Sequence, residues 1–108
     1  MPFITSYVCR DILAYTVPME FEWDSAKAAE NLRRHKVSFD EAATVFGDPL
    51  ALTFADPDHS GSEERFLTFG LSHQNRLLIV SHTARHPRIQ IIGVRRVSRR
   101  ERKIYEEG

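Results

Sequence analysis

The stretch RFLTFGLSHQNRLLIVSHTARHPRIQIIGVR, residues 65–95, holds three apolar runs separated by short polar connections. Runs rich in Val, Ile, Leu and Phe that are bounded by turn residues are typical of strands. We therefore predict strands over residues 65–71, 76–83 and 88–95, joined by a hairpin connection at 72–75 and by a loop containing Pro87. Because short links join successive strands, this region predicts an antiparallel meander.

Two helices are predicted upstream of the meander. Asp24 is a good N-cap for the helix-forming residues 25–35. Ser38 and Glu41 have the spacing of a capping box, in which each residue satisfies an exposed N–H group of the other. The second helix that they open is predicted to end at Gly47.

The remaining patterned segments complete the fold prediction. Residues 21–23 and 50–54 are short strand candidates, and Ser98 with Glu101 forms a second capping box that opens a helix over 99–106. The order is therefore β-α-α-β-β-β-β-α. It predicts an α+β fold, with an antiparallel sheet of about four strands plus a short N-terminal strand, two helices packed on one face and a C-terminal helix.

The chain is predicted to form one domain with an unpatterned start. Its 108 residues, 42% of them hydrophobic, suit a single core. Residues 1–18 show no regular period and end at Pro18, directly before Met19. We expect residues 1–18 to be a disordered extension or a mis-assigned start, and residues 19–108 to be the domain. No run approaches the roughly 20 apolar residues that a membrane helix needs.

Several classes of chemistry find no support in the sequence. One cysteine, Cys9, cannot form an internal disulfide, and we expect a reducing cytoplasm. No Gly-rich phosphate loop is present, and although His82 and His86 are four residues apart, Pro87 and the strand pattern argue against the helix that a zinc-binding His pair needs. Asp56 and Asp58 lack the further ligands of a calcium loop, so they are interpreted as a turn. We therefore predict no cofactor and no metal.

Charge is distributed unevenly although the net charge is zero. Residues 85–103 hold eight Arg or Lys against the single acidic Glu101, a balance of +7. Such a segment favours an anionic partner, which can be RNA, DNA or an acidic protein. The plainer interpretation is a solvated, Arg-rich helix end.

Arginines and histidines on or beside the predicted sheet are the remaining candidates for chemistry. Arg65 and Arg76 stand at strand starts, His82 near the end of the apolar strand, and Arg95 at the end of the last strand. Metal-free RNA cleavage needs groups that bind phosphate and groups that move protons, and arginine and histidine supply these. The plainer interpretations are a surface ion pair for Arg65 and a hydrogen-bonded core residue for His82.

A succession of short motifs covers residues 20–106. The motifs are Phe21–Asp24 with Lys27, Asn31–Phe39, Glu41-Ala42, Val45–Asp48, Glu64-Arg65, Gly70–Ser72, Leu77–Thr83, Ile91-Ile92 with Arg95, and Ser98–Arg102 with Tyr105. Taken together they resemble the BrnT family of bacterial toxins. The resemblance implies a RelE-like fold, metal-independent endoribonuclease activity by attack of the ribose 2′-OH, and inhibition of translation.

The same resemblance implies partners. The chain would be the toxin of a type II toxin–antitoxin pair, neutralised by a BrnA-like ribbon-helix-helix antitoxin. It would meet operator DNA only through the toxin–antitoxin complex, and it would not meet a membrane.

The resemblance also implies site residues, at the positions where this chain keeps the residues of the family. The expected catalytic residues are Arg65, His82, Arg95 and His35, and the expected RNA-binding residues are Arg34, Arg76, Arg96 and Arg99. The chain departs from the family at Gln90 and Gly93, where the family usually has a basic residue and Ser. These departures favour an alternative, a degenerate toxin that only binds its antitoxin and serves promoter control. A plain nucleic-acid-binding domain, tracking phosphates with its basic helix, is a third hypothesis.

Overall fold

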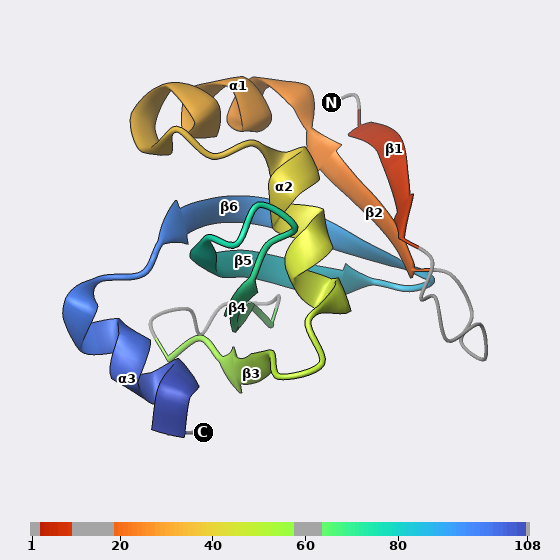
Figure 1. Ribbon diagram of the computed structural model, residues 1–108. Coiled ribbons are helices and arrows are strands. Elements are labelled where there is room, and N and C mark those ends of the chain that lie inside the picture. The colour runs from red at the N-terminus through yellow and green to blue at the C-terminus, as the bar shows by residue number, and fades with distance from the viewer. Residues whose placement is uncertain (1–2, 10–18, 58–63, 108) are drawn as a thin grey trace.

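The computed structural model describes residues 3–9, 19–57 and 64–107, which form a six-stranded sheet (Figure 1). The strands are β1 (Phe3–Cys9), β2 (Met19–Asp24), β3 (Leu52–Ala55), β4 (Phe66–Leu71), β5 (Leu77–Arg85) and β6 (Arg88–Arg96). Their spatial order is β1-β2-β6-β5-β4-β3. The run from β3 to β6 is antiparallel, as the sequence predicts, whereas β2 and β6 are parallel.

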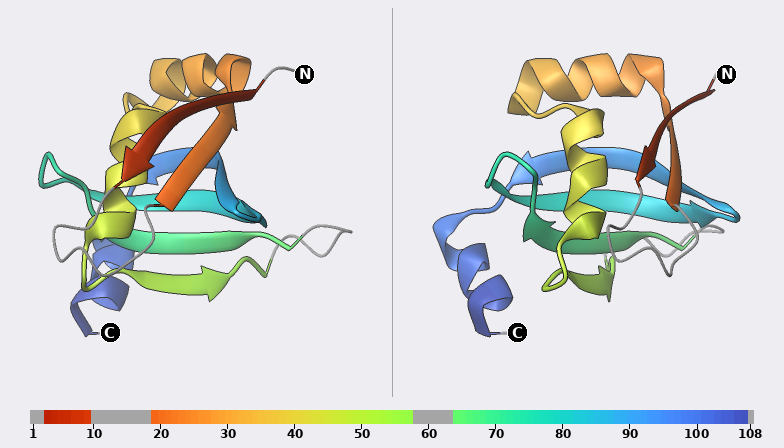
Figure 2. Two further views of the ribbon diagram at one scale, coloured as in Figure 1. Left: turned by 90° about the vertical axis from the view of Figure 1, so that its right-hand side faces the viewer. Right: turned by 45° about the vertical axis from the view of Figure 1, so that its right-hand side comes forward.

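Helices complete the predicted order. They are α1 (Ser25–His35), α2 (Phe39–Thr44) and α3 (Arg99–Glu107), with a short 3₁₀ turn, η1 (Val45–Gly47), after α2. Figure 2 shows α2 lying across the sheet, α1 above β6, and α3 beyond the end of β6. The α+β fold and the order of elements from residue 19 onward are confirmed.

The N-terminal region differs in part from the expectation of a disordered extension. The structure describes residues 3–9 as β1, antiparallel to β2, with Phe3 opposite Asp24 and Cys9 opposite Met19. Residues 1–2 and 10–18 lie outside the described residues. A natural start at Met19 stays a prediction.

Helix starts follow the predicted caps, with one difference. Asp24 caps α1 through Oδ1, which accepts from the Ala26 N–H at 2.8 Å. The capping box of α3 is complete, since the Glu101 N–H donates to Ser98 Oγ and the Ser98 N–H donates to Glu101 Oε1. At α2 only half of the box forms. Ser38 Oγ accepts from the Glu41 N–H, but the Glu41 carboxylate turns away toward the sheet.

The two faces of the sheet have different neighbours. Leu78, Val80 and His82 of β5 point to the face that α2 and η1 cover, here called the helix-covered face. There Phe39, Ala42 and Ala43 of α2 pack into the core beside Leu78 and Val80. Trp23 joins this core, with its ring edge-on to Phe39 at 5.9 Å.

The opposite face carries the alternate residues of the same strands. Because side chains alternate along a strand, Ile79 and Ser81 of β5 point away from the helix-covered face. In the β5–β6 register, Ile79 lies opposite Arg95 and Ser81 opposite Gly93. This side is called the Arg95 face.

Candidate functional site

A depression of about 290 Å³ opens on the Arg95 face. Its floor comes from neighbouring strands, with Leu67 of β4 opposite Ser81 of β5, and Ser81 opposite Gly93 of β6. Ile79 adds a second apolar side chain to this floor. The remaining lining residues stand around it: Asn31 and His35 of α1, Val94 and Arg95 of β6, and Asp56 after β3.

Asn31 fixes α1 to the edge of the sheet. β2 pairs with β6 only from Arg88 to Gln90, so among the described strands none pairs with the later part of β6 on that side. Asn31 takes the place of a strand there, because its Oδ1 accepts from the Val94 N–H at 3.1 Å and its Nδ2 donates to the Val94 carbonyl at 3.0 Å. Nδ2 also donates to the Val37 carbonyl just after α1. The end of α1, with His35, is thereby held at the rim of the depression.

Arg95 supplies the positive charge of the depression and is oriented by α3. Its Nη1 and Nη2 each donate to one oxygen of Glu101 at 2.8 Å, and Nη1 also donates to the Arg96 carbonyl. These bonds leave the side-on pair, Nε–H and one Nη2–H, without a partner among the described residues. A guanidinium edge of this kind binds a phosphate through two parallel hydrogen bonds.

Glu101 is therefore shared between α3 and the site. The hydrogen bonds from Arg95 and from the Ser98 N–H lower the pKa of Glu101 to about 2, so its carboxylate stays ionised. α3 is held a second time at Tyr105, whose hydroxyl donates to Asp48 Oδ2 at 2.7 Å. Burial, followed by this contact with Asp48, raises the pKa of Tyr105 to about 12.

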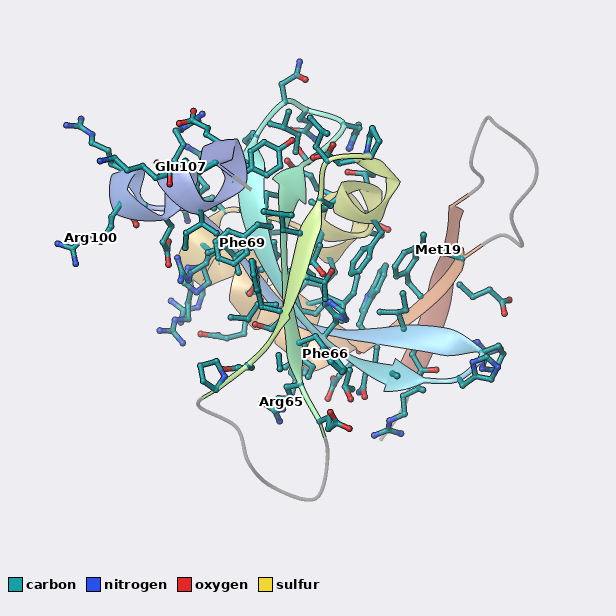
Figure 3. The ribbon with its side chains drawn as sticks, turned by 90° about the horizontal axis from the view of Figure 1, so that it is seen from below. Met19, Arg65, Phe66, Phe69, Arg100 and Glu107 are labelled. Carbon is teal, nitrogen blue, oxygen red and sulfur yellow. The ribbon has the colours of Figure 1, made fainter. Side chains whose placement is uncertain are left out.

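Arg65 lies on the same face as Arg95 but at a distance from it. Phe66 lies opposite His82 on the helix-covered face, so alternation places Arg65 on the Arg95 face, beside Thr83. Thr83 and Ile79 are four residues apart, so Arg65 and Arg95 are separated by about 13 Å along the strands and about 10 Å across them. Figure 3 shows Arg65 where β4 begins. The described lining of the depression does not include Arg65.

His82 points to the other side of the sheet from Arg95. It is 7% exposed, lies between the rings of Phe46 and Phe66, and its Nε2 is 2.7 Å from Thr68 Oγ1. Burial in this apolar surrounding lowers the pKa of His82 to about 4. The structure thus brings His35, and not His82, together with Arg95.

The four arginines expected to bind RNA occupy four different settings. Arg34 is exposed on α1 and lines a second, shallower hollow with His35. Arg96 and Arg99 are exposed near the end of β6 and the start of α3. Arg76 is half-buried and paired with Glu41 of α2, and its Nη2 donates to the Lys36 carbonyl. Arg76 therefore braces the helix-covered face.

Sequence reasoning missed several residues of the depression: Asn31 as the brace of α1, Ser81, Leu67 and Asp56 as lining. The alternation in residues 77–83 carried part of this signal, because it separates Ile79 and Ser81 from Val80 and His82. Cross-strand register is needed as well. β6 has an irregularity beside Ser81 and His82, so Gly93 faces Ser81 while Ile91 faces His82.

Within 19–57 and 64–107, no group of three or more His, Cys, Asp or Glu side chains is arranged to hold a metal ion. None of the helices described has the length and apolar character that crossing a membrane requires.

Comparison with protein families gives one match over most of the chain. Residues 23–101 match the family model described as ribonuclease toxin, BrnT, of type II toxin-antitoxin system. No curated protein matches the chain. The matched range runs from Trp23 to Glu101 and so includes Asn31, His35 and Arg95 of the depression.

Proposed function

The chain belongs to the BrnT family, the ribonuclease toxins of type II toxin–antitoxin systems, and from this premise we propose that it cleaves RNA in the depression on the Arg95 face. The observation that carries the proposal is that Arg95, whose side-on guanidinium edge has no partner among the described residues, lines the same hollow as His35. The protein acts in the cytoplasm as a metal-independent endoribonuclease and inhibits translation.

The reaction is attack of a ribose 2′-oxygen on the adjacent phosphorus, with departure of the 5′-oxygen. Arg95 binds two phosphate oxygens through Nε–H and Nη2–H and neutralises the charge that builds on them. Because Glu101 already fixes the guanidinium, its orientation costs nothing further when substrate binds. The products are a 2′,3′-cyclic phosphate and a free 5′-hydroxyl.

Proton transfer falls to His35 in this proposal. It is the one histidine among the described residues that lines the depression with Arg95, whereas His82 is enclosed in the core. A neutral imidazole accepts the 2′-OH proton, and the imidazolium then donates a proton to the leaving 5′-oxygen. His82 contributes by packing.

Other cations extend the RNA path. Arg65, on the same face beyond the depression, binds a neighbouring phosphate, while Arg34, Arg96 and Arg99 are exposed around the site and attract the chain. The antitoxin is a BrnA-like ribbon-helix-helix protein. It neutralises the toxin by binding it and carries the complex to operator DNA.

A second candidate function is the degenerate toxin that binds its antitoxin without cleaving RNA. One observation favours it, because Gly93 leaves the floor beside Ser81 without the hydroxyl that the family usually has there. In that case the Arg95 face binds only the antitoxin.

Cleavage by the purified chain separates the two functions. RNA incubated with the chain and excess chelator is expected to yield 2′,3′-cyclic phosphate and 5′-hydroxyl ends. In cells, expression of residues 19–108 is expected to arrest growth, and Arg95→Ala and Arg65→Ala are expected to relieve the arrest at equal protein levels. Intact RNA and normal growth with the unsubstituted chain would instead establish the antitoxin-binding function.

A further inference from the structure

We infer that Phe54 of β3 stacks against an unpaired base of the RNA beside the cleaved linkage, so that the Arg95 face binds a nucleotide by its base as well as by its phosphate. The inference rests on the proposed function and adds a substrate-binding residue outside the reacting groups. Three observations carry it: the exposure of Phe54, its place in the sheet register, and the order of charges across the face.

Phe54 is exposed in a fixed orientation. The residue is 45% exposed, and its ring meets the ring of Phe69 edge-on, at 5.8 Å between centroids and 86° between planes. Phe69 is buried and so acts as a rigid support. The contact with Phe69 holds the Phe54 ring, while nearly half of the residue remains exposed. An exposed aromatic ring held in this way is a surface on which unpaired bases stack.

Phe54 adjoins the depression through the sheet itself. It lies opposite Leu67, which lies opposite Ser81, which lies opposite Gly93. The last three of these residues line the depression. Phe54 thus extends the same row of the Arg95 face, three interstrand distances of about 4.8 Å from Gly93.

The charged groups along this row differ between its two ends. Arg95 and His35 stand at the β6 end of the depression, and Asp56 stands at the β3 end, two residues after Phe54. A phosphate is attracted to the Arg95 end. The base of a nucleotide held there by its phosphate extends along the row toward Phe54.

A protein segment is the competing occupant of this surface. Protein interfaces have a desolvated core from which charged residues are depleted. The row on the Arg95 face instead runs from an aromatic ring through a short apolar floor to a guanidinium. This sequence of groups matches a base followed by its phosphate, so the observations favour RNA.

Steady-state cleavage of short unpaired RNA by the whole chain tests the inference. Phe54→Leu keeps an apolar side chain but removes the aromatic ring, and is expected to raise KM by about 5- to 150-fold, the range for loss of one base–aromatic stack. The value of kcat is expected to stay unchanged, since the stack is equal in ground and transition states. Phe54→Tyr is expected to retain the KM of the unsubstituted chain.

The matched control is Leu50→Ala, which trims another exposed apolar residue just before β3. It is expected to leave KM and kcat unchanged. Thermal melts of every variant establish that the fold is intact.

Binding of an uncleavable oligonucleotide keeps this inference separate from the proposed function. A 2′-deoxy analogue carrying 2-aminopurine is expected to lose fluorescence on binding the unsubstituted chain and the Phe54→Tyr variant, but not Phe54→Leu. Failure of the chain to cleave any RNA would overturn the proposed function, while this quenching would still support the stack. If Phe54→Leu had the same KM and the same quenching as the unsubstituted chain, the stack would be overturned. If that variant also escaped neutralisation by an antitoxin, the surface would be assigned to a protein segment instead.

Discussion

The two faces of the sheet each hold an arginine–glutamate pair, and the pairs differ in burial. On the helix-covered face Arg76 pairs with Glu41, whose side chain is 2% exposed. On the Arg95 face Arg95 pairs with Glu101, and the arginine side chain is 46% exposed. Both carboxyl pKa values are lowered, in each case chiefly by the arginine hydrogen bond. The difference teaches that the face an arginine reaches decides whether its ion pair is enclosed by packing or left accessible to a ligand.

Removing each arginine in turn is expected to give the largest and most divergent effects. Arg95→Ala is expected to lower kcat by about a hundredfold or more, the usual cost of losing a well-placed electrostatic donor. Its free energy of unfolding should change by no more than about 1 kcal/mol, because the ion pair is exposed. RNA cleavage and urea unfolding on the same preparations measure both quantities.

Arg76→Ala is the matched variant on the other face. It leaves the buried Glu41 carboxylate without its partner, so the free energy of unfolding is expected to fall by about 3 kcal/mol. Cleavage per folded molecule should remain near that of the unsubstituted chain. A large loss of cleavage in fully folded Arg76→Ala protein would erase the distinction between the faces.

Acid sensitivity is the next largest effect and belongs to the helix-covered face. His82 has a pKa of about 4 in the folded protein, against 6.5 for an unperturbed histidine. Between these values the unfolded chain binds a proton that the folded chain does not, so stability is full above pH 6.5 and falls as the pH drops toward 4. The expected loss is about 3 kcal/mol.

Urea unfolding at several pH values measures this loss, and His82→Phe is expected to remove most of it. The remaining decline should appear below about pH 4.5, where carboxylates such as Glu41 and Glu101 take up protons in the unfolded chain while their lowered pKa values keep them ionised in the folded protein. A slope between pH 6.5 and 4 that is equal with and without His82 would contradict the buried, neutral state of this ring.

A smaller effect is expected where α1 meets the sheet edge. Asn31→Ala removes three hydrogen bonds to the backbone of Val37 and Val94 and is expected to cost about 1–3 kcal/mol of unfolding free energy. Hydrogen exchange at the Val94 amide should accelerate. Glu30→Ala is the control, because it breaks only the exposed ion pair that Glu30, the residue before Asn31, makes with Arg33. It should change neither the free energy of unfolding nor the exchange of the Val94 amide appreciably.

The smallest effect is expected at Gly93, and Gly70 provides the contrast. A Cβ atom added at Gly93 would meet only Asn31 Oδ1, at 3.7 Å, so Gly93→Ser should change stability by no more than about 0.5 kcal/mol. At Gly70 the added atom would lie 2.9 Å from a methyl group of Val45, and Gly70→Ser is expected to cost about 1–3 kcal/mol. Thermal unfolding of the two variants compares free space on the Arg95 face with close packing on the other.

Local sequence signals were sufficient for the elements from residue 19 onward, but they missed β1 and were insufficient for the site. Capping residues such as Asp24 and Ser98 and the apolar runs of 65–95 predicted the helices and the meander, because these signals act between near neighbours. The place of His82 depends on alternation and on the cross-strand register with Ile91, which a single strand does not encode. His82 and His35 are equal candidates by residue type, and only the fold separates them.

The carboxylate of Glu41 illustrates the same limit. Its spacing from Ser38 predicted a full capping box, but its side chain instead binds Arg76 and Ser72, residues more than 30 positions away. A buried charge is better stabilised by a guanidinium than by one backbone N–H, so the Glu41 carboxylate binds Arg76 rather than the backbone of Ser38. Glu101 also binds an arginine, Arg95, six residues before it, yet it keeps its local bond, since its Oε1 accepts from both Arg95 Nη1 and the Ser98 N–H.

The position of β6 has a consequence for synthesis on the ribosome. This strand lies between β2 and β5 in the sheet and is the last strand of the chain. Both neighbouring strands are therefore synthesised before β6 is available to pair with them. Arg95 stands near its end, and the carboxylate that orients Arg95 follows six residues later. Because a polypeptide emerges from its N-terminus, the depression is assembled only when translation is nearly complete. A chain that terminates before Glu101 therefore lacks the carboxylate that orients Arg95, so the proposed function predicts that incomplete chains are inactive.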